Sequence, residues 1–244
     1  MGLIEVLLTW LAAPARWQGS DGIPTRVSEH LILSVLAVLG AAVLALPLGM
    51  ALGHLRKGGF LAMNVANVGR ALPSMALLAL ALPLAFALNL GLGFWPTFLA
   101  LVPLGLPPIL TNTYVAVSEV DADVVDSARG MGMSEWQVLW RVELPLAAAL
   151  IVDGIRNAAV AIVATATLGA LVAGGGLGRY IVDGLQRQET PRILAGAVLV
   201  AMMAIVTEFG LGLVQRMVTP RGASRNIDEP GASVLTTRRG TVSV

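Results

Sequence analysis

The sequence has no cysteine, a single lysine and few charged or aromatic side chains. Without cysteine the chain cannot form disulfides or thiolate metal sites. Charged residues make up only 13% of its 244 residues, whereas soluble domains carry about 25%. Hydrophobic residues make up 56%. This composition is typical of a protein that resides in a lipid membrane.

Two further absences exclude classes of function. The one lysine, Lys57, follows Arg56 and precedes two glycines, so the Gly-x-x-x-x-Gly-Lys-Ser/Thr loop of an ATPase is missing. We therefore expect no ATP hydrolysis by this chain, no bound cofactor and no metal site. The net charge is +1, and no basic patch with interleaved aromatic residues occurs, so nucleic-acid binding is not expected.

Long apolar segments predict an all-α membrane protein with about five transmembrane helices, because a span needs about 20 apolar residues. Pro73 interrupts the second segment, and three prolines bend the third. The expected spans are residues 31–53, 62–87, 94–114, 147–173 and 193–214.

The segments outside these spans are assigned as follows. Residues 1–27 contain an apolar run, Leu3 to Ala13, that is too short to span; it is read as an interfacial helix followed by a polar loop through Thr25, and a sixth span stays open. The transmembrane domain is placed at 28–217, and 218–244 is predicted to be a disordered tail. The glycine run 174–178 favours a helix end over a phosphate cradle, and 179–192 is expected to form a short surface helix.

The polar stretch 118–145 is predicted to be a compact helical loop. A short helix is expected from Val120 to Arg129, with Gly130 and Gly132 forming a corner after it. Ser134, with Gln137 three residues later, fits the capping box of a second helix. That helix is expected to stop at Pro145, which lacks a backbone N–H.

This loop resembles the "EAA" loop of ABC importer permeases, whose form is Glu-Ala-Ala, three residues, Gly, nine residues, then Ile-x-Leu-Pro. Here Asp126-Ser127-Ala128 is followed after three residues by Gly132, and after nine more by Val142-Glu143-Leu144-Pro145. The departures are Asp for Glu, Ser for Ala and Val for Ile. The alternative is an ordinary helical hairpin between membrane helices. The resemblance assigns coupling to an ATPase to Asp126, Ser127, Ala128, Gly130, Gly132, Glu143, Leu144 and Pro145.

The resemblance covers about residues 28–217 and implies the fold of a type I ABC importer permease. It implies four kinds of partner: ABC ATPase subunits that use ATP, an extracytoplasmic substrate-binding protein, a second permease subunit (the same chain or a paralogue) and the lipid membrane. The implied mechanism is alternating access, in which the central loop transmits the motion of the ATPases to the helices.

Within this class the chain is most similar to osmoprotectant permeases, which move glycine betaine, choline or carnitine. In that family a separate binding protein holds the quaternary ammonium group in an aromatic cage. The alternatives left open are an importer for an amino acid or another small solute, an ion-coupled secondary transporter and a non-transporting scaffold. The closer likeness lies in residues 71–74, 127–133, 142–145, 165–168 and 174–178.

The distribution of basic residues predicts the orientation in a bacterial plasma membrane. Ten lie on the side of the 54–61 loop, the 115–145 loop and the carboxyl-terminal tail, and five lie on the other side. We therefore expect the amino terminus outside and the carboxyl terminus in the cytoplasm. The ten are Arg56, Lys57, Arg70, Arg129, Arg141, Arg216, Arg221, Arg225, Arg238 and Arg239, and the five are Arg16, Arg26, Arg179, Arg187 and Arg192.

Charged and amide residues within the spans are candidates for a translocation path or for contacts between helices. Asp153 and Arg156 are three residues apart and can pair on one helix face. Glu208 is expected to pair with Arg156 or to face a water-filled path. The alternative for Asp153 and Arg156 is that they reach to the cytoplasmic interface, and the alternative for Glu208 and Arg156 is that these two side chains reach there independently of each other. Asn112, Asn157, Thr165 and Thr167 either line a route or hold helices together.

Overall fold

The computed structural model describes residues 2–218, apart from the side chains of residues 61, 63, 65, 66 and 70. Every regular element in this part of the chain is helical. The elements are α1 (Leu3–Ala12), η1 (Pro14–Trp17), α2 (Ile23–His54), α3 (Gly59–Ala71), α4 (Ser74–Ala87), α5 (Phe94–Ser118), α6 (Ala122–Gly130), α7 (Glu135–Val138), η2 (Leu139–Glu143), α8 (Leu144–Thr165), η3 (Ala166–Val172), α9 (Gly178–Arg187) and α10 (Thr190–Val218).

Four helical segments are long and apolar enough to cross a membrane: α2, α5, the continuous stretch Glu135–Val172, and α10. The expected second span is instead two helices, α3 and α4, of 13 and 14 residues. They are separated at Leu72, whose ψ of 119° is extended, because the ring of Pro73 disfavours the helical conformation in the residue before it. The predicted interruption at Pro73 is confirmed.

The first long helix begins earlier than predicted. The polar loop expected through Thr25 is wrong in its last residues, since α2 starts at Ile23 with Pro24 in its first turn. The charged side chains in this added turn do not prevent helix formation because they pair. The Arg26 guanidinium lies 2.9 Å from a Glu29 carboxylate oxygen, three residues along the helix.

The helix that follows the central loop does not stop at Pro145, contrary to prediction. Residues Leu139–Glu143 form a π-helical turn that leads directly into α8. The Leu144 N–H bonds the Leu139 carbonyl, five residues back. This wider turn lets Pro145 enter the first turn of α8, where a proline N–H is not needed. The loop is therefore rigidly continuous with the fourth span.

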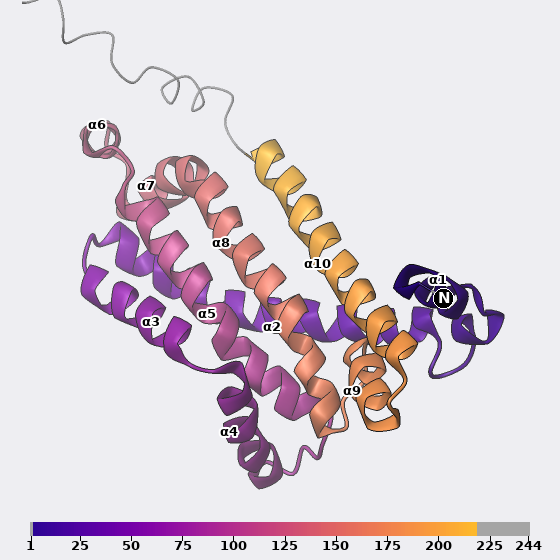
Figure 1. Cartoon of the computed structure of the whole chain (residues 1–244). Coiled ribbons are helices and arrows are strands. Elements are labelled where there is room, and N and C mark those ends of the chain that lie inside the picture. The colour runs from indigo at the N-terminus through magenta and orange to yellow at the C-terminus, as the bar shows by residue number, and fades with distance from the viewer. Residues whose placement is uncertain (1, 219–244) are drawn as a thin grey trace, which may run out of the picture.

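The core forms where α2, α5 and α8 pack together (Figure 1). Small residues let the backbones approach closely. A Cβ on Gly49 of α2 would lie 2.7 Å from the Thr113 Cβ of α5, and one on Gly105 of α5 would lie 2.9 Å from the Ala41 Cβ of α2. A Cβ on Gly154 of α8 would lie 2.7 Å from the Asn112 Cβ of α5. These three helices therefore form one closely packed unit.

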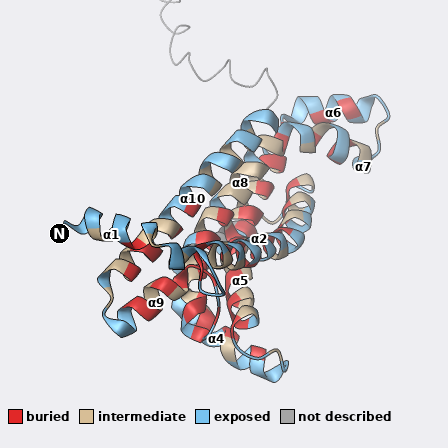
Figure 2. Ribbon diagram, turned by 90° about the vertical axis from the view of Figure 1, so that its right-hand side faces the viewer, coloured by how far each residue is buried: buried red, intermediate tan, exposed pale blue. Residues whose placement is uncertain are grey.

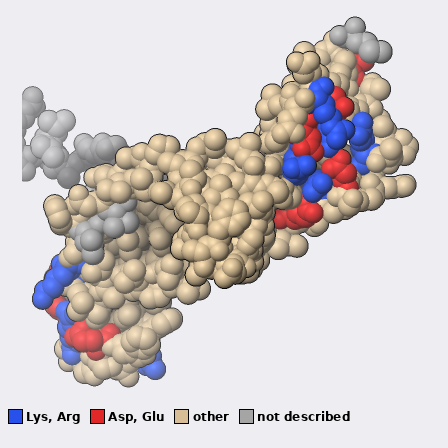
Figure 3. Space-filling model, turned by 90° about the horizontal axis from the view of Figure 1, so that it is seen from below, with Lys and Arg blue, Asp and Glu red and all other residues tan. Residues whose placement is uncertain are grey.

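The outer faces of the long helices are apolar and exposed, as a membrane protein requires (Figure 2). Only 11% of an 18-residue apolar stretch of α10 is buried inside the molecule. Phe209 of this helix is 72% exposed. On the face seen in Figure 3, Lys, Arg, Asp and Glu gather at two ends of the molecule, with an uncharged middle between them. This distribution fits two water-facing ends and a lipid-facing belt.

The amino-terminal segment forms a helix, as predicted, and packs on the rest of the chain. Trp10 of α1 contacts the Tyr180 ring of α9 edge to face, with centroids 5.4 Å apart. The Arg16 guanidinium lies 4.7 Å from the centre of the Trp10 ring. At the other end of the chain, α10 ends at Val218, and the remainder of the predicted tail lies outside the described residues.

Candidate functional site

The central loop turns at a glycine corner, as predicted. The Met133 N–H bonds the Ala128 carbonyl, and the Gly132 N–H bonds the Arg129 carbonyl. This pair of bonds is the Schellman motif that ends many helices, and it requires a left-handed residue at the position of Gly132. Gly132 has a φ of +87°, and a Cβ there would meet nothing within 4 Å. The backbone conformation, rather than a lack of space, therefore favours glycine at this position.

Side chains hold the two helices beside this corner. Ser134 and Gln137 form the predicted capping box at the start of α7. The Arg129 guanidinium donates to both carboxylate oxygens of Glu135, at 2.9 and 3.0 Å, and lies 3.2 Å from Asp126. Hydrogen bonds to Glu135 raise the pKa of Arg129 above its ordinary value, so this cross-link keeps its charge. The corner is thus fixed on both sides.

The loop has an apolar underside and a mixed outer face. Val125, Ala128 and Val138 are buried against one another under α6 and α7. Asp126, Ser127 and Gly130 lie on the exposed side, and Pro145 is also exposed. Large apolar side chains accompany them, since Met131 is 75% and Trp136 68% exposed. Of the predicted coupling residues, Ala128, Glu143 and Leu144 instead face the molecule's interior or are half-buried.

Glu143 is fixed by a residue that the sequence did not point to. Its side chain is almost fully buried, and its carboxylate lies 2.6 Å from Nδ1 of His54. The other ring nitrogen of His54 lies 3.2 Å from Glu135. His54 is the last residue of α2, so it attaches the loop at two points to the first long helix. Only the fold brings together residues 89 positions apart.

A second polar group joins α8 to α10. The Arg156 guanidinium lies 2.7 Å from Asp153 and donates to the Gln215 amide oxygen at 2.8 Å. Its Nε lies 3.5 Å from Glu208, an ion-pair distance without a hydrogen bond. The geometry agrees with the expected pairing of Glu208 with Arg156, rather than with two side chains that reach the interface independently. The role of the pair in transport stays a prediction.

Asp153 also reaches the neighbouring helix. Its Oδ2 accepts a hydrogen bond from the Asn157 amide at 3.1 Å and another from the Asn112 amide of α5 at 3.3 Å. The Gln215 amide donates to the Ala149 carbonyl and approaches Asp153 Oδ1 at 3.5 Å. Asp153 is therefore the central member of a network that runs from α10 across α8 to α5.

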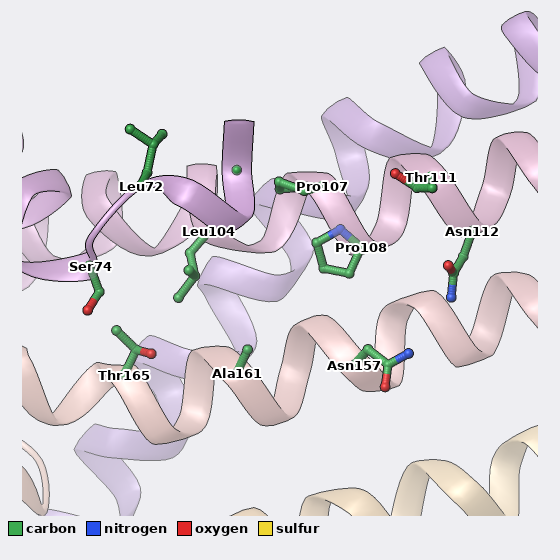
Figure 4. Close-up of a pocket in the computed structure, with 11 residues that line it drawn as sticks. Leu72, Ser74, Leu104, Pro107, Pro108, Thr111, Asn112, Asn157, Ala161 and Thr165 are labelled. Atoms are coloured by element: carbon green, nitrogen blue, oxygen red, sulfur yellow. The ribbon is translucent and has the colours of Figure 1, made fainter. Parts of the chain in front are cut away.

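A cavity of about 480 Å³ lies beside this network, between α5, α8 and the break that separates α3 from α4 (Figure 4). Its walls carry hydroxyl and amide groups among apolar ones, and none of the described side chains that line it is charged. The Thr111 hydroxyl of this wall makes no hydrogen bond within the described residues. Of the polar residues singled out from the sequence, Asn112, Asn157 and Thr165 line the cavity, and Thr167 does not.

A third polar cluster lies at the opposite end of the molecule from the loop. The predicted surface helix 179–192 is partly wrong, because Tyr180 and Arg192 are buried. The Arg192 guanidinium lies 2.8 Å from Asp21 and 3.3 Å from Asp183. Burial, followed by the charge of Asp21, raises the pKa of Tyr180 to about 12. The Tyr180 hydroxyl therefore stays protonated and donates to the Asp21 carbonyl at 2.6 Å.

The glycine run 174–178, which precedes α9, packs against residues of α2. The Gly176 N–H donates to a Glu29 carboxylate oxygen at 2.7 Å, and Gly176 has a φ of +80°. His30, about two turns into α2, lies against the same run and contacts the Val163 carbonyl through Nε2 at 2.9 Å. The run is thus the expected helix end, and its partners come from α2.

Comparisons with known proteins agree on one family. Residues 30–222 match the model of the "Binding-protein-dependent transport system inner membrane component". The chain is 38% identical to the glycine betaine/carnitine/choline transport system permease protein OpuCB of Bacillus subtilis, over 81% of this chain and 88% of that protein. It is 38% identical to the carnitine transport permease protein OpuCB of Listeria monocytogenes, over 83% and 90% respectively.

A more distant relative and a solved structure extend the likeness. The osmoprotectant import permease protein OsmW of Salmonella typhimurium is 32% identical over 80% of this chain and 90% of its own length. The fold is similar to that of a chain in the inward-facing MetNI methionine ABC transporter, with a TM-score of 0.70 over 79% of this chain and 94% of that chain. At 21% identity, this last likeness concerns the fold alone.

The contact between His54 and Glu143 should contribute measurably to stability. We expect His54→Leu to destabilise the protein by about 1–3 kcal/mol, because a buried carboxylate oxygen loses its partner. Adding Glu143→Leu should restore part of this loss, since the second change removes the unpaired group. Thermal unfolding of the detergent-solubilised protein measures both effects.

Glu119→Leu is the matched control, because Glu119 is an exposed carboxylate at the start of the same loop. It should change stability by no more than about 0.5 kcal/mol. Strictly additive effects of His54→Leu and Glu143→Leu would show that the two side chains are not coupled.

Proposed function

The chain belongs to the family of inner-membrane components of binding-protein-dependent transport systems, and from this membership we propose that it forms the membrane path of an ATP-driven importer for quaternary ammonium osmoprotectants. The family makes it a transport subunit. The observation that carries the substrate class is that relatives covering about four fifths of the chain are permeases for glycine betaine, carnitine and choline. The proposed substrates are these compounds or close analogues.

The central loop is the proposed contact with an ATPase subunit. Its outer face combines exposed apolar side chains, such as Trp136 and Met131, with Asp126 and Ser127. Apolar side chains of this size are costly to expose to water and are enriched where proteins meet. The ATPase subunit binds and hydrolyses ATP, and this chain supplies the surface on which the ATPase acts.

Rigidity supports the role of the loop as a lever. The corner is held by the Schellman motif and by Arg129, and the loop continues through the π-turn into α8 without a flexible joint. His54 attaches it to α2 as well. A push on α6 and α7 is therefore passed to two of the three core helices, and such closely packed elements move as units rather than deform.

The proposed path runs through the cavity between α5, α8 and the α3–α4 break. Its neutral hydroxyl and amide groups suit a small, soluble substrate that must enter and leave. A second permease subunit, either another copy or a paralogue, completes the proposed path. A separate extracytoplasmic binding protein delivers the substrate.

The same proposal fixes the orientation in the plasma membrane. The loop that meets the ATPase must face the cytoplasm, which places the Arg192 cluster and the amino-terminal segment outside. The bias of basic residues toward the loop side agrees with this arrangement. The carboxyl-terminal end of α10 then lies on the cytoplasmic side.

Uptake measurements test the substrate class. The chain, expressed with its cognate ATPase and binding protein in a bacterium that lacks quaternary ammonium uptake, should restore accumulation of radiolabelled glycine betaine, choline or carnitine. Cells that express the chain with an ATPase unable to hydrolyse ATP are the control and should accumulate none. Accumulation of labelled methionine, without that of any quaternary ammonium compound, would favour the amino-acid importer instead.

The corner glycine should be essential for coupling. Gly132→Val places a β-branched residue at a φ of +87°, which costs about 1–2 kcal/mol and distorts the loop. We expect uptake to fall about tenfold while membrane insertion stays normal and ATP hydrolysis no longer responds to substrate-loaded binding protein. Gly210→Val is the matched control, because Gly210 is an exposed helical residue of α10, outside the loop, and its Cβ would meet nothing within 4 Å. Normal uptake by Gly132→Val would refute the docking role.

The orientation can be read by thiol labelling, because the natural chain has no cysteine. Ser20→Cys should react with a membrane-impermeant maleimide added to intact cells, and Glu119→Cys, at the start of the central loop, should react only after the cells are opened. Both residues are exposed in the folded chain. The reverse pattern would invert the proposed topology.

A further inference from the structure

The two amides on the cavity wall share one carboxylate oxygen. Asp153 Oδ2 accepts from Nδ2 of Asn157 at 3.1 Å and from Nδ2 of Asn112 at 3.3 Å. The other oxygen, Oδ1, is occupied by Arg156 at 2.7 Å. The carboxylate therefore has one side toward the cavity amides and one side toward the guanidinium.

This arrangement fixes the direction of both amides. An ionised carboxylate only accepts hydrogen bonds, so each Asn must present its NH₂ group to Asp153. The amide oxygen lies on the other branch of the same planar group and points away from Asp153. Both residues line the cavity, and neither amide oxygen accepts a hydrogen bond from another residue in the part of the chain that the structure describes.

We propose that Asp153 is a positioning residue that turns the carbonyl oxygens of Asn112 and Asn157 into the cavity, where they form a contact site for a methylated ammonium cation. The inference deepens the proposed function and rests on it for the identity of the cation. The close approach of α5 and α8 at Gly154 makes the arrangement possible, because a Cβ there would lie 2.7 Å from the Asn112 Cβ.

The chemistry of the site suits such a group. A quaternary ammonium ion has no N–H to donate, and its charge is spread over methyl groups that make weak C–H···O contacts with carbonyl oxygens. Oriented carbonyl dipoles attract cations without carrying a net charge. The positive charge of the Arg156 guanidinium, which would repel a cation, is offset by the carboxylates of Asp153 and Glu208.

The site is expected to bind weakly. None of the described side chains that line the cavity is aromatic, so these residues do not provide the cation–π attraction that holds quaternary ammonium groups tightly. Weak contacts allow the substrate to leave as readily as it enters, which a transport path requires.

A thiol in the cavity can report its electrostatic preference. Ala161, one helical turn from Asn157 on α8, also lines the cavity, and the natural chain has no cysteine. The probes are two methanethiosulfonate reagents of similar size, one with a trimethylammonium group and one with a sulfonate. The measurement is the ratio of their reaction rates with the Ala161→Cys thiol in the assembled transporter, in membranes open on both sides.

We expect Asn157→Leu in this background to lower the ratio of cationic to anionic rates by about threefold, the size of one weak C–H···O contact. Asp153→Asn should lower the ratio as well, because the amides are then free to turn. Asn64→Leu is the matched control: Asn64 of α3 donates to the Phe60 carbonyl outside the cavity, and its loss should leave the ratio unchanged.

The direction of the Asn157→Leu effect decides between two origins of cation preference. If the charge of Asp153 acted directly, removing the amide that covers it would raise the ratio. A raised or unchanged ratio therefore overturns the carbonyl site. Should Asp153→Asn fail to insert into membranes, Asn157→Leu alone carries this decision, since it leaves the ion pairs in place.

The labelling ratio tests the carbonyl site, and the uptake measurement tests the substrate class, so either claim can be refuted without the other. A lowered ratio in a transporter that accumulates no quaternary ammonium compound would support the carbonyl site and refute the proposed substrate. Uptake of choline by a transporter whose ratio does not fall with Asn157→Leu would support the substrate and refute the site.

Discussion

The close approach of α2, α5 and α8 is the constraint on which the other features depend. Glycine and alanine at the crossings let the three backbones meet, so that added side-chain atoms at Gly49, Gly105 or Gly154 would overlap a neighbour. In lipid, apolar side chains gain nothing by leaving the solvent for one another, so packing and internal hydrogen bonds must hold helices together. The same approach brings Asn112 within reach of Asp153, and thus connects the core to the cavity.

Charged residues in this protein are placed where partners compensate the cost of removing them from water. Arg156 meets Asp153 and Glu208 at the α8–α10 contact, and Arg192 meets Asp21 and Asp183 at the other end. Each group joins segments that are distant in the chain. A buried charge without a partner is strongly destabilising, so these groups also make the arrangement of helices specific.

The central loop shows which structural features can be predicted from residues that are close together in the sequence. The capping box at Ser134 and the corner at Gly132 depend on residues within a few positions of each other, and both were predicted correctly. The stop expected at Pro145 was wrong for a local reason that the sequence did not disclose: a π-turn places the proline in the first turn of α8. The beginning of α2 was also misplaced. Arg26 and Glu29 pair within the helix, and this pairing lowers the free-energy cost of placing charged side chains in its first turns.

The sequence by itself determined the membrane class, the approximate positions of the long helices, the break at Pro73 and the family to which the loop belongs. These follow from composition and from patterns between near neighbours, where the physical interactions are local. Only the tertiary structure decided that His54 holds Glu143, that Asp153 holds two amides from different helices and that Tyr180 and Arg192 are buried. Such contacts join residues between 4 and 171 positions apart, and the packing of small residues between helices, which no local pattern encodes, brings the distant ones together.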